Sequence, residues 1–384
     1  MLLTHEHEEL RRSIKKWVND EINPFIDDWE AAHIFPAHQV FKSLGDKGFL
    51  GINKPEKFGG LGLDFSYAAV MAEALATIKA GGVPMAIGVQ TDMCTPALAK
   101  HGSDELRNEF LRPAIAGDMV GCIGVSEPGG GSDVAAVKTT ARKDGDDYII
   151  NGTKLWITNG IQADFCCLLA NTSDGPMHKN KSLIVVPMNT KGVSITKKIT
   201  KIGMHSSDTA QIFFDDVRVP QRNLIGDENK GFIYQMEQFQ FERLWVALNS
   251  AAGFQRAIDI TVDYTKERKA FGQSLSNNQW VNFKLAEMQT QVDALAALNW
   301  KGVEMVVAGL DATRIATSAK LMAGQLSRTL PDGCLQFWGG MGYSAESEIS
   351  RLYRDTRLTA IGGGADEVML QILTKFMGIY SSNQ

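Results

Sequence analysis

Apolar residues recur at helical spacing through the first 120 residues of the chain. In the stretch HEELRRSIKKWVNDEINPFI, Ile14 and Trp17 fall on one face of a helix. The segments SYAAVMAEALATI and DELRNEFLRPAIAG continue this pattern; Ser103 is typical of a helix N-cap and Gly117 of a helix end. We therefore expect an N-terminal helical domain over residues 1–120.

The pattern changes to short β-rich runs between residues 121 and 225. DFCCLLA, SLIVVPM, GVSITKKI and AQIFFDDVRVP are each rich in β-branched or aromatic residues and are bounded by Gly, Pro, Asn or Asp. In DYIINGTKLWITNG, the dipeptide Asn151-Gly152 lies between two such runs and predicts a hairpin turn. These features predict a middle antiparallel β domain over residues 121–225.

Long helices return after residue 225. FKLAEMQTQVDALAALNWKGVEMVV places Leu285, Val292 and Leu295 at bundle spacing, and TRIATSAKLMAGQLSRTL carries a second apolar stripe. A last helix is expected to begin near Asp366. Residues 226–384 are therefore predicted to form a C-terminal four-helix bundle, and the fold class is α+β and mostly α.

Composition narrows the classes of function. The chain has 384 residues with a formal net charge of −5 and no basic block, which argues against nucleic acid or an anionic membrane as the main partner. The cysteines and histidines show no metal-ligand spacing, so we expect reduced thiols and no metal site. No apolar run reaches the ~18 residues of a membrane span, and early charges argue against a signal peptide. An intracellular enzyme or binding protein is expected.

Several glycine-rich or charged motifs are candidates for chemistry, and each has a purely structural alternative. SEPGGGSD, residues 126–133, could bring its backbone close to a phosphate or a cofactor ring, but it fits neither a Walker A loop nor a dinucleotide fingerprint. The simpler alternative is a structural loop. WITNG at 156–160 would otherwise be strand core, ERKAFGQ at 267–273 a solvated face, and QFWGGMGY at 336–343 a turn between helices.

Two further stretches leave alternatives open. In FQFERLWVA, Glu242 lies among aromatic and apolar residues. Such a carboxylate either faces outward with Arg243, which is the commoner case for an isolated glutamate, or lies in a pocket that raises its pKa. Near the C-terminus, IGGGADEVM places three glycines before Asp366, and a flexible turn before a helix is the simplest interpretation.

Taken in order, SEPGGGSD, WITNG, ERKAFGQ, QFWGGMGY and GGADEV resemble the acyl-CoA dehydrogenase family over essentially the whole chain. The resemblance implies FAD between the β domain and the bundle, and oxidation of the Cα–Cβ bond of an acyl-CoA to a 2-enoyl-CoA with hydride transfer from Cβ to flavin N5. It also implies a homotetramer, arranged as a dimer of dimers, and electron-transferring flavoprotein as electron acceptor. An acyl-CoA oxidase and a non-catalytic flavoprotein relative are the alternatives.

The resemblance also assigns residues to cofactor and substrate. Contacts with FAD of the same subunit would come from Ile123, Val125, Ser126, Ser132, Trp156, Ile157 and Thr158. Contacts with FAD of a neighbouring subunit would come from Arg268, Phe271, Gln279, Gln336, Gly339 and Gly340. Near FAD, at the start of the last helix, would lie Ala365 and Glu367. Contacts with substrate would come from Ser132, Gln240, Arg243, Gly363 and Gly364.

One departure from the family pattern concerns the catalytic base. Most members carry the catalytic glutamate directly before the glycine of the closing motif, where this chain has Gly363. Isovaleryl-CoA and long-chain acyl-CoA dehydrogenases instead carry a glutamate directly before an arginine, early in the first bundle helix. QFERL matches that pattern, so the resemblance implies that Glu242 is the base for the α-proton. The Gly363 N–H would still bind the thioester oxygen.

The same departure bears on the substrate. A glycine at position 363 leaves volume that could admit a branched acyl chain. GGVPMAIGVQTDMCTPALA and IGGGADEVM are most similar to bacterial citronellyl-CoA dehydrogenases, which take a β-methyl-branched acyl-CoA. Medium or long straight chains stay open as alternatives. The resemblance places the enzyme in a bacterial cytoplasm, or in the mitochondrial matrix if the source is eukaryotic.

Overall fold

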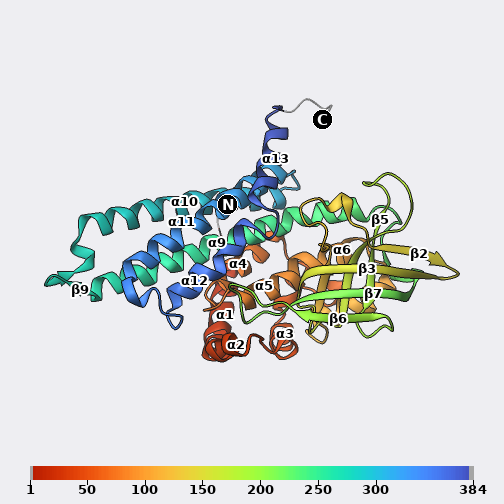
Figure 1. The fold of residues 1–384 in the computed structure, drawn as a ribbon, viewed down its shortest axis with the longest axis horizontal. Coiled ribbons are helices and arrows are strands. Elements are labelled where there is room, and N and C mark those ends of the chain that lie inside the picture. Colours follow the sequence, from red (N-terminus) through yellow and green to blue (C-terminus); the bar gives the residue numbers. More distant parts are fainter. Residues whose placement is uncertain (1–2, 380–384) are drawn as a thin grey trace.

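Helices form the first part of the chain in the computed structural model, which describes residues 3–379 (Figure 1). The outer ends of the first and last predicted domains, residues 1–2 and 380–384, lie outside the described residues. As predicted, the Ser103 side chain caps a helix by accepting a hydrogen bond from the Leu106 N–H at 3.1 Å. The helices are α1 (His5–Trp17), α2 (Ile26–Ala32), α3 (Ala37–Asp46), α4 (Phe65–Leu75), α5 (Gly82–Gly88), α6 (Thr95–His101), α7 (Asp104–Leu106) and α8 (Arg112–Ile115).

A twisted sheet follows, with strand order β6-β7-β3-β2-β4-β5-β8 and β1 beside β4. Its strands are β1 (Gly121–Gly124), β2 (Thr140–Asp144), β3 (Asp147–Thr158), β4 (Phe165–Asn171), β5 (Lys181–Pro187), β6 (Val193–Lys198), β7 (Thr209–Pro220) and β8 (Leu224–Ile225). The pairing is mainly antiparallel, but β1 runs parallel to β4 and a single bridge joins β2 to β4 in parallel. The predicted antiparallel β domain is confirmed in its main pairing, and these two parallel pairs are an addition to it. The parallel pairing of β1 with β4 is possible because β2 and β3 form the long crossover that a parallel pair needs.

Asn151-Gly152 does not form the predicted hairpin turn. β3 continues through both residues, and the hairpin between β2 and β3 turns at Gly145 instead. At Asn151 the register with β7 shifts, and its side-chain amide exchanges two hydrogen bonds of 2.9 Å with Asp216. The prediction was wrong because this amide completes a β-bulge, which suits the same residue type as a turn.

Long helices form the last part of the chain: α9 (Gly231–Glu267), α10 (Gln279–Val307), α11 (Thr313–Trp338), α12 (Glu348–Thr356) and α13 (Asp366–Phe376). A small hairpin of β9 (Lys269–Ala270) and β10 (Gln273–Ser274) joins α9 to α10. α9, α10, α11 and α12 pack together, while α13 packs on α11 and projects from the body of the molecule (Figure 1). The final helix begins at Asp366, as predicted.

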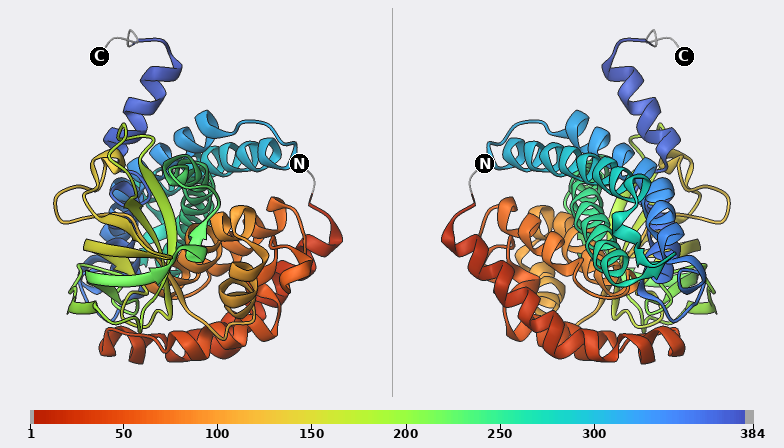
Figure 2. Two further views of the ribbon diagram at one scale, coloured as in Figure 1. Left: turned by 90° about the vertical axis from the view of Figure 1, so that its right-hand side faces the viewer. Right: turned by 90° about the vertical axis from the view of Figure 1, so that its left-hand side faces the viewer.

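The long helix α9 holds the three parts of the fold together. It packs on α4 of the N-terminal part, on β5 of the sheet and on α10 and α11 of the bundle. In the side views, the first helices of the chain lie along the edge of the molecule opposite to α13 (Figure 2). Among residues 3–379, no helix combines the length and apolar character that a membrane span requires. The three parts therefore meet around α9, which is where a site shared by all of them would lie.

Candidate active site

A cavity of about 920 Å³ lies where the three parts of the fold meet. Its walls come from residues 76–93 of the N-terminal helices, from β1, β3 and the loop after β1, from α9, and from the loop before α13. Mostly apolar side chains with a few polar groups among them line it, which is typical of small-molecule and cofactor sites. The volume is large enough for a substantial organic ligand.

The β wall of the cavity carries the first set of predicted cofactor residues. All seven residues predicted to contact FAD of the same subunit line the cavity: Ile123, Val125, Ser126, Ser132, Trp156, Ile157 and Thr158. The glycine-rich loop is fastened to β3 by a hydrogen bond from the Leu155 N–H to the Ser126 carbonyl at 2.9 Å. The buried Lys154 ammonium also donates to the Val125 carbonyl at 3.0 Å and to Glu127 at 2.9 Å. The fold thus brings the SEPGGGSD and WITNG motifs together in one wall of the cavity.

Trp156 has an unusual backbone conformation at this wall. Its φ is 66°, in a region where a bulky side chain is strained by about 1–3 kcal/mol. The strain coincides with a register shift between Lys154 and Ile157, and it leaves the indole 60% exposed. Two residues further on, Thr158 is half-buried at the cavity. An exposed aromatic face beside a hydroxyl suits a flat polar ring system.

The opposite wall is one face of α9. Phe239, Glu242, Arg243, Val246 and Asn249 follow helical spacing and line the cavity. Burial raises the pKa of Glu242 to about 7, with the charges of Arg243 and of Lys320 on α11 acting against this rise. Glu242 forms no hydrogen bond or ion pair with any other described residue. This half-buried carboxylate at the cavity wall is therefore available to a ligand, in contrast to the outward-facing alternative.

Arg243 occupies a different environment from its neighbour. Its side chain is buried, and its Nη1 lies 3.5 Å from the Thr317 hydroxyl on α11. Its Nε has no hydrogen-bond partner among the described residues. Because an unpaired buried donor is costly, this guanidinium group is suited to meet a polar group of a ligand in the cavity.

The glycine loop closes the cavity beside Glu242. Gly363 and Gly364 have φ of 64° and 99°, which other residue types rarely adopt. A Cβ added to Gly363 would lie 3.4 Å from Oε1 of Glu242 and 3.3 Å from Val246. The Gly363 N–H has no acceptor among residues 3–379. The turn predicted from IGGGADEVM is therefore present, and it leaves both open volume and a free donor at the base.

Lys320 is a residue of the site that sequence reasoning missed. It is fully buried on α11, and its ammonium donates to the carbonyls of Thr359 at 2.6 Å and Gly364 at 2.7 Å. Burial lowers its pKa to about 8. A lysine beside Ala319 in the predicted apolar stripe was the available signal, because a charged residue there must find buried partners.

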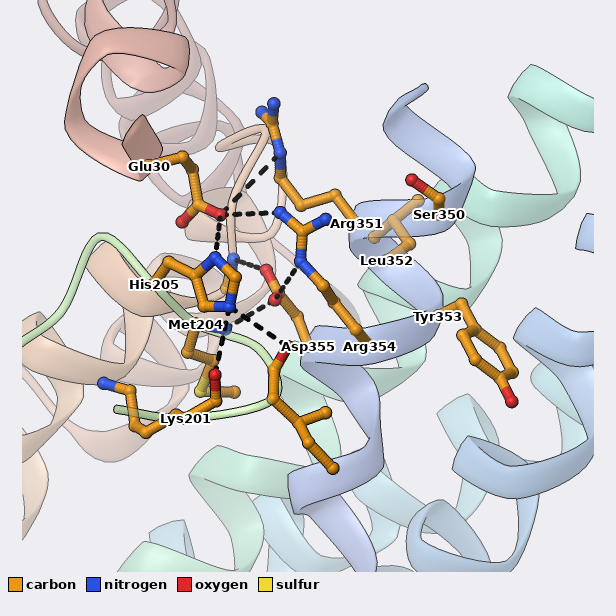
Figure 3. A network of polar contacts seen from close by, with 12 residues as sticks. Glu30, Lys201, Met204, His205, Ser350, Arg351, Leu352, Tyr353, Arg354 and Asp355 are labelled. Atoms are coloured by element: carbon orange, nitrogen blue, oxygen red, sulfur yellow. Dashed lines mark hydrogen bonds and ion pairs between the residues drawn. The ribbon is translucent and has the colours of Figure 1, made fainter. Parts of the chain in front are cut away.

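A polar network fastens the parts of the fold together at the edge of the cavity (Figure 3). Glu30 on α2 accepts a hydrogen bond from Arg354 on α12 at 2.9 Å and another from the Ser206 N–H at 2.8 Å. Asp355, which follows Arg354 on α12, accepts hydrogen bonds from the N–H groups of Gly81 at 2.8 Å and Met204 at 2.5 Å. The cavity wall contributed by α12 is thus fixed to the other two parts of the fold.

Models of three parts of one family match nearly the whole chain. They are the acyl-CoA dehydrogenase N-terminal domain over residues 4–118, the middle domain over residues 122–217 and the C-terminal domain over residues 229–378. The chain belongs to the acyl-CoA dehydrogenase family. Members of this family are oxidoreductases that act on CH–CH donors, so the resemblance deduced from the motifs is confirmed at the level of family, fold and enzyme class.

Individual members of the acyl-CoA dehydrogenase family agree over the full length. The chain is 35% identical to the long-chain specific acyl-CoA dehydrogenase, mitochondrial, of Sus scrofa, covering 97% of this chain and 87% of that protein. It is 33% identical to the short-chain specific acyl-CoA dehydrogenase, mitochondrial, of Rattus norvegicus, covering 97% and 90%. A solved acyl-CoA dehydrogenase from Geobacillus kaustophilus is 37% identical, with a TM-score of 0.94 and 98% of each chain covered.

The second set of predicted cofactor residues of this acyl-CoA dehydrogenase lies away from its own cavity. Arg268, Phe271, Gln279, Gln336, Gly339 and Gly340 gather at the end of the bundle marked by β9 in Figure 1, opposite to the sheet. Stacking of Tyr264 on Trp338, with ring centroids 4.1 Å apart, joins the two motifs there. The structure therefore brings ERKAFGQ and QFWGGMGY together, and their contact with a neighbouring subunit's FAD stays a prediction.

Three other predicted residues do not line the cavity: Gln240, Ala365 and Glu367. Their predicted contacts with substrate or FAD stay predictions. Asp366, whose carboxylate is another candidate by sequence, is buried and binds Arg328 on α11 at 2.8 Å. The Asp366 carboxylate is thus engaged with α11, and the expectation that the carboxylates of GGADEV are not the base stays a prediction.

Proposed function

We propose that this chain is an FAD-dependent acyl-CoA dehydrogenase in which Glu242 removes the α-proton of the substrate. The observation that carries the proposal is the half-buried, unpaired carboxylate of Glu242 in the shared cavity, beside the open volume at Gly363. Family membership supplies the reaction class, the formation of a 2-enoyl-CoA from an acyl-CoA. The geometry bears on which carboxylate does the proton transfer.

The residues of the β wall fit FAD. Trp156 offers an exposed indole face, and Thr158 and Ser126 offer hydroxyls. Among residues 3–379, no atom other than those of Gly129 and its two chain neighbours lies within 4 Å of where a Cβ would stand on Gly129. Such a loop lets a large cofactor approach the backbone closely. When bound, FAD supplies the acceptor for the hydride that leaves Cβ of the acyl chain.

Glu242 is suited to proton abstraction near neutral pH. A general base works best when its pKa is close to the operating pH, and burial brings the pKa of Glu242 to about 7. As it takes the proton, its carboxylate becomes a neutral acid in an apolar environment, which burial favours. The aromatic residues around it therefore serve the reaction as well as the packing.

Negative charge that develops on the thioester oxygen needs a donor. The Gly363 N–H faces no acceptor within the described chain, and it lies on the loop next to Glu242. Backbone N–H groups held in place for such an oxyanion account for a large share of catalysis in acyl chemistry. We assign this role to Gly363, with Arg243 and Ser132 as further substrate contacts.

The acyl chain is the finer part of the proposal. The apolar side chains that line the cavity include Met85, Val89, Met93 and Val246, and the missing side chain at Gly363 widens it beside Glu242. These features favour a branched acyl-CoA of the citronellyl type, or a medium- or long-chain acyl-CoA. A larger residue at position 363 would occupy the space that a β-methyl branch needs.

Partners follow from the same assignment. We propose electron-transferring flavoprotein as electron acceptor, and a homotetramer in which the far end of each bundle reaches the FAD of a neighbour. The compartment would be a bacterial cytoplasm, or a mitochondrial matrix in a eukaryote. An acyl-CoA oxidase would differ in one measurable respect, because its reduced flavin would be reoxidised by air as fast as by electron-transferring flavoprotein.

Anaerobic bleaching of the bound flavin by a panel of straight and branched acyl-CoAs tests the function. The proposal predicts rapid bleaching by at least one branched or medium- to long-chain acyl-CoA, and slow reoxidation by air. Failure of every acyl-CoA in the panel to bleach the flavin would contradict it.

A further inference from the structure

We propose that Lys320 is a positioning residue that acts through the glycine loop and Glu242. Its ammonium ties together the two ends of that loop, and its positive charge stands beside the base. The inference rests on the proposed role of Glu242 and adds a residue that the family motifs did not mark.

The first observation is where the two hydrogen bonds of Lys320 lead. The carbonyl of Thr359, 2.6 Å from Nζ, belongs to the short helical turn before the glycines. The carbonyl of Gly364, 2.7 Å from Nζ, is at the end of the glycines, and Ala365 alone separates it from α13. One side chain from α11 thus spans the entrance and the exit of the loop that carries Gly363.

The second observation is how little else holds the middle of this loop. The N–H groups of Ile361 and Gly362 both donate to the Leu358 carbonyl at 2.8 Å, within the preceding turn. Among the described residues, the N–H groups of Gly363 and Gly364 have no acceptor. Glycine also has the least restricted backbone of all residue types. The direction of the Gly363 N–H therefore depends on the anchors that Lys320 provides.

The third observation is the meeting of two charged side chains at Gly363. A Cβ on Gly363 would lie 3.6 Å from Cε of Lys320 and 3.4 Å from Oε1 of Glu242. The ammonium-bearing carbon and the base thus approach the same glycine from two different helices. The carbonyl groups that Lys320 binds carry no net charge, so its positive charge is left to act on the carboxylates around it.

The charged groups around this pair come from three helices. Lys320 faces Glu242 and Arg243 on α9 and Asp366 on α13, and Glu242 faces Arg243 and Lys320. Burial lowers the pKa of Lys320 to about 8, so the ammonium form predominates at pH 7. Its charge opposes the effect of burial on Glu242. Without Lys320, Arg243 would be left as the cation facing the base.

Two variants separate the anchoring from the charge. Lys320→Met has a side chain of similar length but removes both the hydrogen bonds and the charge. Lys320→Gln, whose side chain is as long as that of Met, removes the charge but keeps an N–H donor. Leu326→Ala, a substitution in the bundle core on the same helix, serves as the control for a purely structural disturbance.

The decisive readout is an infrared pH titration of the Glu242 carboxyl band in the flavin-loaded protein, with the band identified by its absence in Glu242→Gln. This readout needs no turnover. In the unmodified protein we expect a midpoint of about 7. Both Lys320 variants should raise it by about one pH unit, because loss of a nearby positive charge favours the protonated acid. Leu326→Ala should lower the melting temperature and leave the midpoint where it was.

Flavin reduction by acyl-CoA supplies the second readout. The comparison is made at a pH high enough for Glu242 to be ionised in both variants. There we expect the flavin of Lys320→Met to be reduced at least about tenfold more slowly than that of Lys320→Gln, because only Met removes the donor that anchors the loop. An unchanged midpoint in both variants would overturn the proposal. So would failure of both variants to fold with flavin bound, because Lys320 would then be a residue of folding alone.

Failure of the proposed function is recognised separately. In that case the unmodified protein would not reduce its flavin with any acyl-CoA, or Glu242→Gln would reduce it as fast. The infrared titration would still report whether the charge of Lys320 acts on Glu242.

Discussion

A Cβ on Gly363 would lie 3.4 Å from Oε1 of Glu242, so side chains at position 363 of the glycine loop and at position 242 of α9 reach the same part of the cavity. A carboxylate carried by either position would reach the same volume. The chain places its carboxylate on α9 and leaves the loop position without a side chain. If Glu242 is the base, as proposed, the small residue at position 363 leaves its carboxylate and the reacting carbons the volume that a second side chain would fill.

Filling this volume should narrow the range of substrates. Gly363→Glu adds a side chain at a φ of 64°, where it is strained, and brings a second carboxylate next to Glu242. We expect kcat/KM for β-methyl-branched acyl-CoAs to fall at least about tenfold, and straight chains to be affected less, because a large side chain excludes the branch. Steady-state kinetics on matched branched and straight substrates measure the effect.

A graded variant keeps this prediction specific. Gly363→Ala adds only Cβ, so its losses should lie between those of Gly363→Glu and the unmodified enzyme. Undiminished turnover of branched acyl-CoAs by Gly363→Glu would show that the volume at Gly363 does not select for them.

The raised pKa of Glu242 makes a prediction about stability. A pKa of about 7 in the folded protein, against 4.5 in a free side chain, means that the folded state holds the proton more tightly than the unfolded state. This contribution is fully present below pH 4.5 and is lost as the pH rises through 7. At pH 8 the buried carboxylate should therefore lower the free energy of unfolding by on the order of 2 kcal/mol relative to its value below pH 4.5.

Glu242→Gln removes that cost because its amide does not ionise. We expect the variant to melt a few degrees above the unmodified protein at pH 8, and most of that difference to be gone at pH 5. Differential scanning calorimetry at the two pH values gives the comparison. Glu267→Gln, at the exposed end of the same helix, should change the melting temperature little at either pH. A melting difference for Glu242→Gln that did not depend on pH would contradict the raised pKa.

The position of the ERKAFGQ motif predicts that FAD binding depends on the association of subunits. Arg268 lies at the far end of the bundle and does not line its own cavity. If it binds the FAD of a neighbouring subunit, Arg268→Gln should lower the flavin content per chain severalfold, because a bidentate charged donor is lost. The absorbance ratio of flavin to protein measures this. The exposed Lys269→Gln is the control, and full flavin content in Arg268→Gln would argue against a shared site.

The ion pair between Arg354 and Glu30 at the edge of the cavity should contribute more to the free energy of unfolding than an exposed ion pair does. Arg354→Met leaves the buried carboxylate of Glu30 without its 2.9 Å partner. Because Glu30 keeps the Ser206 N–H at 2.8 Å and Arg351 at 3.9 Å, we expect the loss of this one charged hydrogen bond to cost about 1–3 kcal/mol. Arg222→Met removes an exposed pair with Glu109 and should cost less than about 1 kcal/mol. Denaturant unfolding of both variants tests the contrast, and equal losses would contradict it.

The order of the three parts was predictable from periodicity and residue type. Ile14, Trp17, Val292 and Leu295 are buried as their helical spacing indicated. The bulge at Asn151-Gly152 was not predictable in this way. The choice between a turn and a bulge depends on a partner strand that the local sequence does not contain. The parallel pairing of β1 with β4 is equally non-local.

The candidate site shows the same division. Motifs identified the β wall, and the FERL pattern identified Glu242, although local sequence alone favoured an exposed glutamate. Lys320 escaped notice because its partners are backbone carbonyls, which no side-chain pattern marks. The closeness of Gly363 to Glu242 likewise arises from the packing of α9 against the loop, which no short motif encodes.

The central claim is that Glu242 removes the α-proton, and anaerobic stopped-flow reduction of the flavin tests it most directly. We predict that Glu242→Gln retains FAD and a native melting transition, yet reduces its flavin with a good acyl-CoA substrate at least about 10³-fold more slowly than the unmodified enzyme. Near-normal bleaching of the flavin in that variant would contradict the account.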